Sequence, residues 1–461
     1  MTKEIGFAYT YTGRVPGERR PYESYFEASK RDRILHRPAA VGHHRPARQP
    51  SRPYPEPRPG SPERDAPVQL LYAATLVWPG TLVPADGVYA TTTGCYRNGI
   101  SLPQEATTLA HRFSEADYDT GYIGKWHLAG TEPVPEAERG GYQYWLASNV
   151  IEYTSEAYRT VVYDEDNEPV RLPGYRVDAL TDAAIRYVDA HQDRPFFLFL
   201  SLLEPHHQNQ TDSYPAPKGY AERYAGRWMP PDLAELGGSA PEHLAGYCGQ
   251  IKRIDEAFGR LLEALESLGL RENTVVVFAS DHGNHFKTRN DEYKRSPHES
   301  SIRVPIVLLG PGFEGGGRVE QLVSLLDLPP TLLDAAGLPV LDEIQGRSVL
   351  PLLEGERERW PEGVLVQISE SQVGRAIRTR RWKYCVVAPE ADPKEDPSAE
   401  RYVEDGLYDL KADPYELRNL AGLRSHTDVA DTLKHHLIAR MVEIGESHPI
   451  VEPPSSTPST T

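Results

Sequence analysis

Two short runs of almost entirely apolar residues place the strongest constraint on how this chain can fold. They span residues 195–201 and 274–279, and polar or charged side chains follow each of them closely. Such runs are typical of strands buried on both faces, in a sheet covered by helices. Between them, apolar residues recur at helical spacing over residues 251–268, and Gly269 is a stop signal. We therefore predict an α/β fold with a mostly parallel central sheet flanked by helices.

Candidate functional residues lie just beyond the ends of the predicted strands. Lys125 and His127, for example, stand in a Gly-Lys-Trp-His motif at the end of one strand. Because parallel strands present their carboxyl ends at one edge of a sheet, we expect the side chains at these ends to converge in one pocket. Lys125 alone would more often be a solvated surface lysine, and its Gly-Lys-Trp-His context reverses that expectation. The candidate set is Lys125, His127, His206, Asp281, His282 and Lys294.

These motifs and their order resemble the formylglycine-dependent sulfatases, a family within the alkaline-phosphatase superfamily. Residues 121–128 resemble one of the two sulfatase signatures, residues 280–283 resemble a metal-ligand strand end, and residues 407–420 resemble the C-terminal signature. The resemblance extends from about residue 89 to about residue 425. It implies an alkaline-phosphatase/sulfatase-like fold with a small C-terminal antiparallel sheet and helix.

The resemblance also implies the chemistry. A sulfatase stabilises negative charge on sulfuryl oxygens with cations and hydrogen-bond donors, and a histidine can protonate the leaving oxygen. The implied catalytic residues are Lys125, His127, His206 and Lys294. A bound Ca²⁺ or Mg²⁺ polarises the sulfate, and its implied ligands are Asp281 and His282. The family's nucleophile is a formylglycine made from cysteine or serine, so a formylglycine-generating enzyme and a small-molecule sulfate ester are implied partners.

The nucleophile motif itself is absent. Counting back from residues 89–100, which resemble the segment after the family's nucleophile, the nucleophile position falls on Val77 and the motif arginine on Thr81. Valine has no nucleophilic atom, and threonine has no charge. At the end of the first predicted strand, within residues 5–14, Tyr11 stands where the resemblance implies an aspartate ligand. We therefore expect an impaired site that binds a divalent cation poorly.

The composition upstream is equally unusual. Residues 37–67 contain 9 Pro and 6 Arg, and Val41 is the only aliphatic residue among them larger than alanine. Such a window cannot form a core strand or a packed helix. Reading the codons of residues 77–87 from the second base of the valine codon permits Cys-Gly-Pro-Ala-Arg-x-x-Leu-Gln-Thr-Gly, a sulfatase-like motif. Our hypothesis is that the segment from before Arg37 to about Asp86 is a frame-shifted translation of a sulfatase gene.

The pattern changes again near residue 363, where short alternating runs begin. Residues 364–368 and 382–387 predict strands of a small antiparallel sheet, closed by a helix around residues 431–446. The predicted division is a sulfatase-like α/β catalytic domain over 1–360 with an aberrant segment at 30–88, a C-terminal α+β subdomain over 361–450, and a disordered tail over 451–461.

The bulk composition indicates which partners fit. A formal net charge of -17 disfavours nucleic acid and anionic membrane surfaces. The first residues contain no apolar leader, and no run approaches the length of a membrane span. Three cysteines without zinc or disulfide spacing suit a reducing compartment. We expect a cytoplasmic protein that binds neither nucleic acid nor membranes.

Three functions remain open. The first is a sulfatase that hydrolyses a sulfuric ester with a metal and formylglycine. The second is a phosphoester or phosphonate hydrolase of the same superfamily, distinguished by the ester it turns over. The third is a catalytically inactive, anion-binding relative that uses the remaining lysines and histidines. The resemblance favours the first for the family and an intact gene, whereas the missing nucleophile favours the third for the chain as written.

Overall fold

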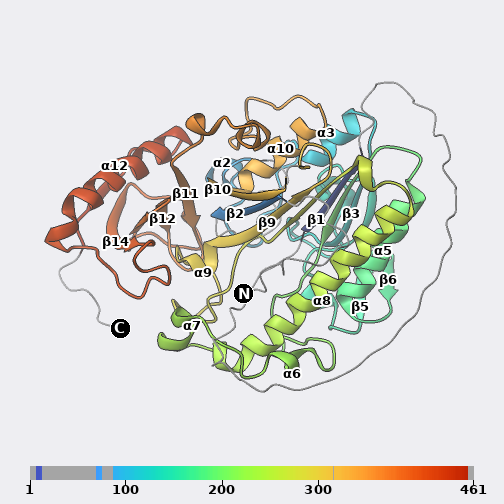
Figure 1. The fold of residues 1–461 in the computed structure, drawn as a ribbon, viewed down its shortest axis with the longest axis horizontal. Helices are drawn as coiled ribbons and strands as arrows, with labels where there is room; N and C mark the ends of the chain where they lie inside the picture. Colours follow the sequence, from blue (N-terminus) through green and yellow to red (C-terminus); the bar gives the residue numbers. More distant parts are fainter. Residues whose placement is uncertain (1–6, 13–68, 75–86, 315, 455–461) are drawn as a thin grey trace, which may run out of the picture.

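Two sheets organise the molecule (Figure 1). The computed structural model describes residues 7–12, 69–74, 87–314 and 316–454. Within them, the larger sheet has the strand order β10-β2-β9-β8-β1-β7-β3-β4-β5-β6. Its strands are β1 (Phe7–Thr12), β2 (Gln69–Ala74), β3 (Asp119–Lys125), β4 (Tyr144–Ser148), β5 (Thr160–Tyr163), β6 (Pro169–Leu172), β7 (Phe196–Ser201), β8 (Thr274–Ala279), β9 (Arg303–Leu309) and β10 (Gly317–Val323). Val77, Thr81 and most of the segment 30–88 lie outside the described residues.

The pairing of neighbouring strands is mixed. β3 runs parallel to both β4 and β7, and β2 runs parallel to β10. β1 is antiparallel to β7 and β8, and β9 is antiparallel to β2 and β8. The α/β class is confirmed, but the sheet is mixed rather than mostly parallel: among the described strands, three neighbouring pairs are parallel and six are antiparallel.

Helices cover both faces of this sheet, as the apolar strands require. Along β7, Phe196, Leu198 and Leu200 pack into one core, while Phe197 and Phe199 belong to the core on the opposite face. The first core includes α5 (Arg176–Ala190) and α8 (Ala240–Ser267), and the second includes α3 (Leu109–Glu115) and α10 (Leu328–Ala335), as Figure 1 shows. Burying each such aromatic side chain contributes about 1.5–3 kcal/mol.

The long helix α8 begins earlier than its apolar pattern predicts. It starts at Ala240 with proline in its first turn and ends before Gly269, whose φ is +69°. The predicted stop is therefore confirmed, because glycine enters the left-handed region without steric strain. Helix α10 likewise has proline in its first turn, and Gly337 follows it with φ +68°. Shorter helices are α2 (Ala90–Thr93), α4 (Ile151–Thr154), α6 (Tyr220–Tyr224), α7 (Pro231–Glu235), α9 (Glu299–Ile302) and α11 (Leu350–Leu353).

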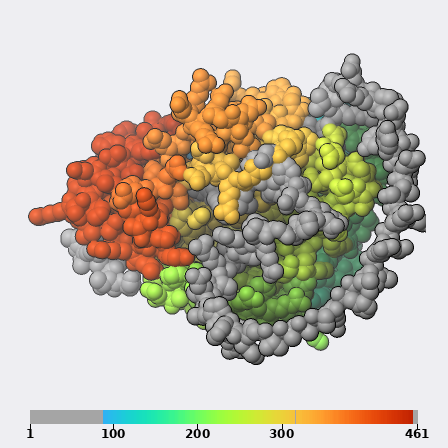
Figure 2. All heavy atoms as spheres, in the orientation of Figure 1, coloured from blue at the N-terminus to red at the C-terminus, as the bar shows by residue number. Residues whose placement is uncertain are grey.

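A second sheet lies at one end of the molecule, where the red C-terminal residues gather in Figure 2. Its strands are β11 (Gly363–Ile368), β12 (Gly374–Thr379), β13 (Trp382–Val387), β14 (Arg401–Asp409) and β15 (Ile450–Glu452). The first four pair antiparallel, as predicted, and β15 adds parallel to β14. Helix α12 (Thr427–Glu443) packs on β11, β12 and β13. β15 crosses the boundary that the sequence analysis places after residue 450.

The direction of β1 corrects one expectation. Tyr11 pairs with Phe197 and Val275, at the beginnings of β7 and β8, whereas Phe7 pairs with their last residues, Ser201 and Ala279. Tyr11 is therefore at the sheet edge opposite to the one that carries Asp281, and the prediction that it takes the place of a metal ligand is wrong. An apolar pattern predicts a strand, but it carries no information on which way the strand runs.

Candidate functional site

Three loops leave the larger sheet at one edge and carry the predicted site residues. Lys125 is the last residue of β3, and β3 is parallel to β7 with Gly124 opposite Ser201. The loop with His206 follows β7, and Asp281 and His282 follow β8, which runs in the same direction as β7 because both are antiparallel to β1. This is the edge where open α/β sheets place their sites.

Lys294 and His282 are two predicted site residues that contact each other directly. The Lys294 Nζ lies 2.7 Å from His282 Nε2, which lies 3.3 Å from Asp281 Oδ2. His282 Nδ1 is 2.8 Å from the carbonyl oxygen of Gly283. A carbonyl only accepts, so Nδ1 carries the ring proton, and Nε2 accepts a hydrogen bond from the Lys294 ammonium. All three side chains are buried, which strengthens these polar contacts.

This arrangement does not provide a complete metal site. A metal would need the Nε2 lone pair of His282, which here accepts from Lys294. Ca²⁺ takes six to eight oxygen ligands. In the part of the chain that the structure describes, no group of three or more His, Cys, Asp or Glu side chains could hold an ion. Asp281 contributes one carboxylate, and the described residues therefore do not make a complete Ca²⁺ site.

Lys125 has a different partner, which could not be predicted from the sequence. Its Nζ lies 2.6 Å from Oε1 of Glu152, and both side chains are 0% exposed. Glu152 belongs to the short helix α4, directly after β4, the neighbour of β3. Nothing in the sequence distinguishes this buried glutamate from a surface one, because its burial depends on the packing of β4 against β3.

A second buried ion pair holds the loop that carries His206. Arg176 Nη2, on α5, lies 2.9 Å from Glu204 Oε1, with side-chain exposures of 1% and 0%. The same guanidinium donates to Gln208 Oε1 at 3.3 Å, and Gln208 donates to the carbonyl oxygen of Glu152 at 3.0 Å. The loop after β7 is thus tied to the helix that holds Lys125 in place.

The environment of His206 settles its hydrogen-bonding role. Burial lowers the pKa of His206 well below its ordinary value, and the charges of His207, Lys294 and Lys125 lower it further. The ring is therefore neutral at pH 7. Its Nδ1 lies 2.6 Å from the carbonyl oxygen of His207, so Nδ1 bears the proton and Nε2 is an acceptor. Donation from Nε2, which the resemblance implies for a proton donor, requires a second proton.

His127 lies two residues beyond β3 in a strained conformation. Its φ is +60°, and its backbone N–H donates to the carbonyl oxygen of Asn149 at 2.8 Å. Non-glycine residues in this region are uncommon and are concentrated at functional sites. The ring is partly exposed, unlike those of His206 and His282.

A cavity of about 200 Å³ adjoins Lys294. It is lined by His207 and Asp212 from the loop after β7, and by Lys287 and the run Asp291–Lys294 from the loop after β8. Asp212, with its lysine and tyrosine partners across the cavity, was absent from the sequence-derived set. Its contacts reach 75 and 81 residues along the chain, to Lys287 and Tyr293, so no local pattern marks them.

The C-terminal region braces the loop that carries Lys294. Arg289 donates to the carbonyl oxygens of Tyr415 at 2.8 Å and Glu416 at 3.0 Å, within the C-terminal signature predicted from the sequence. Arg295 forms an ion pair with Glu370, in the loop between β11 and β12. Two arginines of one loop are thus anchored on the second sheet.

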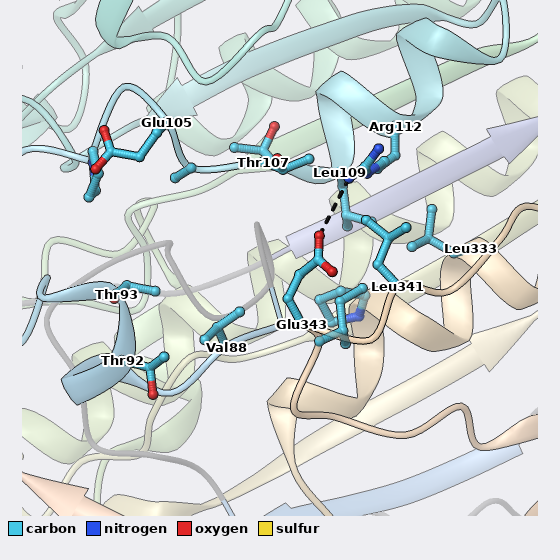
Figure 3. A pocket seen from close by; sticks show the side chains of 15 residues that line it. Val88, Thr92, Thr93, Glu105, Thr107, Leu109, Arg112, Leu333, Leu341 and Glu343 are labelled. Atoms are coloured by element: carbon cyan, nitrogen blue, oxygen red, sulfur yellow. Dashed lines mark ion pairs between the residues drawn. The ribbon is translucent and has the colours of Figure 1, made fainter. Parts of the chain in front are cut away.

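A larger cavity, of about 380 Å³, lies elsewhere, between the segment 88–112 and the segment 329–344 (Figure 3). The Arg112 Nη2 and the Glu343 Oε1 form an ion pair of 3.7 Å at this cavity. Much of the remaining lining is apolar, with Leu109, Leu333 and Leu341 among the residues drawn. The six predicted site residues are all described by the structure, and none of them lines it.

Comparisons with known proteins agree with this architecture. The family model described as Sulfatase matches residues 83–338, and that described as N-sulphoglucosamine sulphohydrolase, C-terminal, matches residues 291–443. The ulvan-active sulfatase of Formosa agariphila is 30% identical over 380 residues, which cover 78% of this chain and 70% of that protein.

Solved structures share the fold at lower identity. The putative sulfatase YidJ from Bacteroides fragilis has a TM-score of 0.70 at 22% identity, covering 81% of this chain and 87% of that chain. BT4656, in complex with its substrate D-glucosamine-2-N,6-O-disulfate, has a TM-score of 0.67 at 22% identity, covering 83% and 92%. A phosphonate monoester hydrolase from Silicibacter pomeroyi has a TM-score of 0.60 at 19% identity, covering 83% and 90%.

Proposed function

The chain belongs to the sulfatase family, and from that premise we propose that its strand-end site binds the sulfate group of a sulfuric ester. By family it is a sulfatase-like hydrolase. One observation carries the proposal: Lys294, a buried lysine whose ammonium lies 2.7 Å from Nε2 of His282, lines a cavity beside the loops that follow β7 and β8. A lysine held in place beside a cavity suits an anion better than a neutral ligand.

The residues around the proposed sulfate site have different roles in binding. Lys294 contributes an ammonium beside the cavity, and His282 fixes that ammonium by accepting one of its hydrogen bonds. Glu152 and the Arg176–Glu204 pair hold Lys125 and the His206 loop in position. In the Nδ1–H tautomer of neutral His206, the Nε2 would accept a hydrogen bond from the ester's alcohol part rather than donate to its sulfate.

Hydrolysis in this family generally uses a divalent metal and a formylglycine nucleophile. The family match begins at residue 83, beyond Val77 and Thr81, and neither of those residues is a formylglycine precursor. For the chain as written we therefore propose sulfate binding without turnover. Restoring the nucleophile motif, and exposing the chain to a formylglycine-generating enzyme, would be required for catalysis.

A sulfated sugar is the substrate class that we propose, because BT4656 shares the fold and is described with a sulfated glucosamine as its substrate. A cytoplasmic location, which the sparse cysteines favour, is part of the same proposal.

The binding proposal is tested by titrating the full chain with methyl sulfate and following its NMR signals. Replacing Lys294 by methionine should weaken binding roughly tenfold or more, since hydrogen bonds to charged groups contribute about 1.5–3 kcal/mol. Lys252→Met, at a surface lysine paired with Asp255 at 3.0 Å, is the control and should leave binding unchanged. Equal affinities of the wild type and Lys294→Met would contradict the proposal.

The alternative, a phosphoester or phosphonate hydrolase, is examined with the same protein and methyl phosphate. The family and the fold allow it, since the phosphonate monoester hydrolase shares this architecture. Binding of methyl phosphate that is tighter than that of methyl sulfate, and equally sensitive to Lys294→Met, would favour this alternative.

A further inference from the structure

The cavity beside Lys294 contains a network of polar side chains that the binding of a sulfate group does not use. Lys287 Nζ lies 3.2 Å from Asp212 Oδ2, and the Tyr293 hydroxyl donates to Asp212 Oδ1 at 2.5 Å. The Lys287 ammonium also lies over the Tyr293 ring, 4.7 Å from its centroid. His207 packs on that ring with centroids 4.4 Å apart. These four side chains form one connected wall of the cavity that Lys294 also lines.

The backbone around this wall is held in unusual conformations. Asp212 has a φ of +45°, and the adjacent residues Phe286 and Lys287 have φ values of +50° and +62°. Residues other than glycine rarely adopt such φ angles, so the surrounding structure must hold these residues in place. Arg289 and Arg295, anchored on the second sheet, brace this loop. A strained segment that is braced from outside and lines a cavity beside a site is expected to position its side chains for a ligand.

The wall suits hydroxyl groups. Asp212 offers acceptor oxygens and Lys287 offers donor hydrogens side by side, and two neighbouring hydroxyls of a sugar ring need both. Burial acts to raise the pKa of Asp212, but hydrogen bonds from Tyr293 and Lys287 bring it below its ordinary value, so the carboxylate is ionised at pH 7. Both groups are partly open to solvent, with side-chain exposures of 35% for Lys287 and 51% for Asp212, so a ligand can reach them.

The charges that line the cavity limit which substituents a sugar ring bound there can have. Asp212 is paired with Lys287, and Glu292 is paired with Arg295 at 2.7 Å. Lys294 serves the sulfate. Asp291, an exposed lining residue, makes none of the ion pairs found among the described residues, and it leaves the cavity with surplus negative charge. A second sulfate on the ring would be repelled by it. A volume of about 200 Å³ is below the roughly 300–1,000 Å³ of pockets for drug-sized ligands, so it fits a single ring.

We propose that this cavity is the pocket for the alcohol part of the ester, and that Lys287 and Asp212 select a single sugar ring with neighbouring hydroxyls and only one sulfate. This inference rests on the proposed function, because it places the sulfate itself at Lys294. It assigns ligand specificity to Lys287 and Asp212, and it excludes disulfated sugars as ligands.

The test compares three ligands on the full chain by NMR titration. Methyl sulfate reports on the sulfate site alone, N-acetylglucosamine 6-O-sulfate adds a ring, and glucosamine 2-N,6-O-disulfate adds a ring with a second anion. We expect the monosulfated sugar to bind roughly tenfold more tightly than methyl sulfate, the effect of one or two hydrogen bonds to charged groups. The disulfate should bind more weakly than the monosulfated sugar.

Two variants connect this difference to the wall. Lys287→Asn and Asp212→Asn each remove a charge, and asparagine tolerates the positive φ of both positions. In each variant, the affinity for the monosulfated sugar should fall to that for methyl sulfate measured on the same variant. Asp291→Asn should improve binding of the disulfate. Lys252→Asn is the matched control, since Lys252 has the same 35% side-chain exposure and a similar ion pair of 3.0 Å.

The outcomes separate the two proposals. If methyl sulfate binds but the sugar ring adds no affinity, or if both asparagine variants at the wall behave as the wild type does, the pocket is wrongly assigned and the sulfate site stands. If methyl sulfate does not bind the wild-type chain, the proposed function is contradicted, and this inference is overturned with it.

Discussion

The two buried lysines of the site show how the same residue type serves different ends. Lys125 is sealed against Glu152, with both side chains 0% exposed and their charged atoms 2.6 Å apart. Lys294 donates to the neutral ring of His282 at 2.7 Å and lines a cavity. The charge of Lys125 is balanced by a carboxylate at contact distance, whereas the ammonium of Lys294 contacts the imidazole of His282, and Lys294 is one of the residues that line the cavity. We infer that the Lys125 side gives rigidity and that the Lys294 side meets the substrate.

The difference between the two lysines is tested most directly by two variants, one that removes the partner of Lys125 and one that removes Lys294 itself. Glu152→Ala leaves the Lys125 ammonium buried without its carboxylate, and should lower the free energy of unfolding by about 3–5 kcal/mol. Lys294→Met removes one charge-assisted hydrogen bond and should lower it by about 1.5–3 kcal/mol. Urea unfolding measures both. If Lys294→Met proves the more damaging variant, the assignment of roles must be reversed.

The bracing of the Lys294 loop can be examined separately. Arg289→Ala removes the hydrogen bonds to the carbonyl oxygens of Tyr415 and Glu416. The two bonds come from one guanidinium and together should contribute about 1.5–3 kcal/mol, so we expect a loss of stability in that range and weaker binding of methyl sulfate. Arg380→Ala, at an exposed pair with Glu320, is the control and should cost about 0–1 kcal/mol. Unchanged methyl sulfate affinity in Arg289→Ala would show that this bracing does not reach Lys294.

Acid should act on the Lys294 loop through its histidines. Burial lowers the pKa of His298 well below its ordinary value, and burial also lowers the pKa of His285 to about 4. Below about pH 6.5 these histidines bind protons in the unfolded chain, whereas their buried rings in the native protein stay neutral. The free energy of unfolding therefore falls as pH falls. Each histidine contributes at most about 1.4 kcal/mol per pH unit. Asp327, whose pKa burial raises to about 6, opposes this fall.

His298→Gln isolates one of these contributions. The variant should show a shallower fall of unfolding free energy between about pH 6.5 and pH 4.5 than the wild type, because glutamine binds no proton. Chemical denaturation at a series of pH values measures the slope. A slope equal to that of the wild type would mean that His298 titrates normally in the folded protein.

The smallest expected effect is that of calcium. The described residues do not fit a complete Ca²⁺ site, so about 1 mM CaCl₂ should raise the free energy of unfolding by less than about 0.5 kcal/mol. A gain near 4 kcal/mol would require a dissociation constant about a thousandfold below that concentration. Such a gain, or submicromolar affinity in calorimetry, would show that ligands outside the described residues complete the site.

Sequence reasoning recovers the elements whose signal is local. The strands β7, β8 and β13 follow from their apolar runs, and the end of α8 follows from Gly269. The direction of β1 could not be predicted, because a period-two pattern is the same in both directions. Tyr11 was therefore placed at the wrong edge of the sheet.

The residues of the candidate site likewise include some that could be predicted from the sequence and some that could not. Lys125 could be predicted as a site residue because its Gly-Lys-Trp-His motif is contiguous, and Lys294 because it stands shortly before residues 301–306. Glu152, Arg176 and Asp212 could not, because each gains its role from a partner that is 27, 28 or 75 residues away in the chain. The tautomer of His206 likewise depends on its contact with the carbonyl oxygen of His207, which only the folded loop provides.

Turnover of a chromogenic aryl sulfate tests the central claim most directly: that this chain retains a sulfatase's anion site but lacks its nucleophile. The wild type, Val77→Cys, and a chain rewritten over residues 77–86 as Cys-Gly-Pro-Ala-Arg-Ser-Ser-Leu-Gln-Thr are each co-expressed with a formylglycine-generating enzyme. We predict no turnover by the first two, because Thr81 supplies no motif arginine, and measurable though partial turnover by the rewritten chain. Clear turnover by the wild-type chain would contradict the claim and require a different nucleophile.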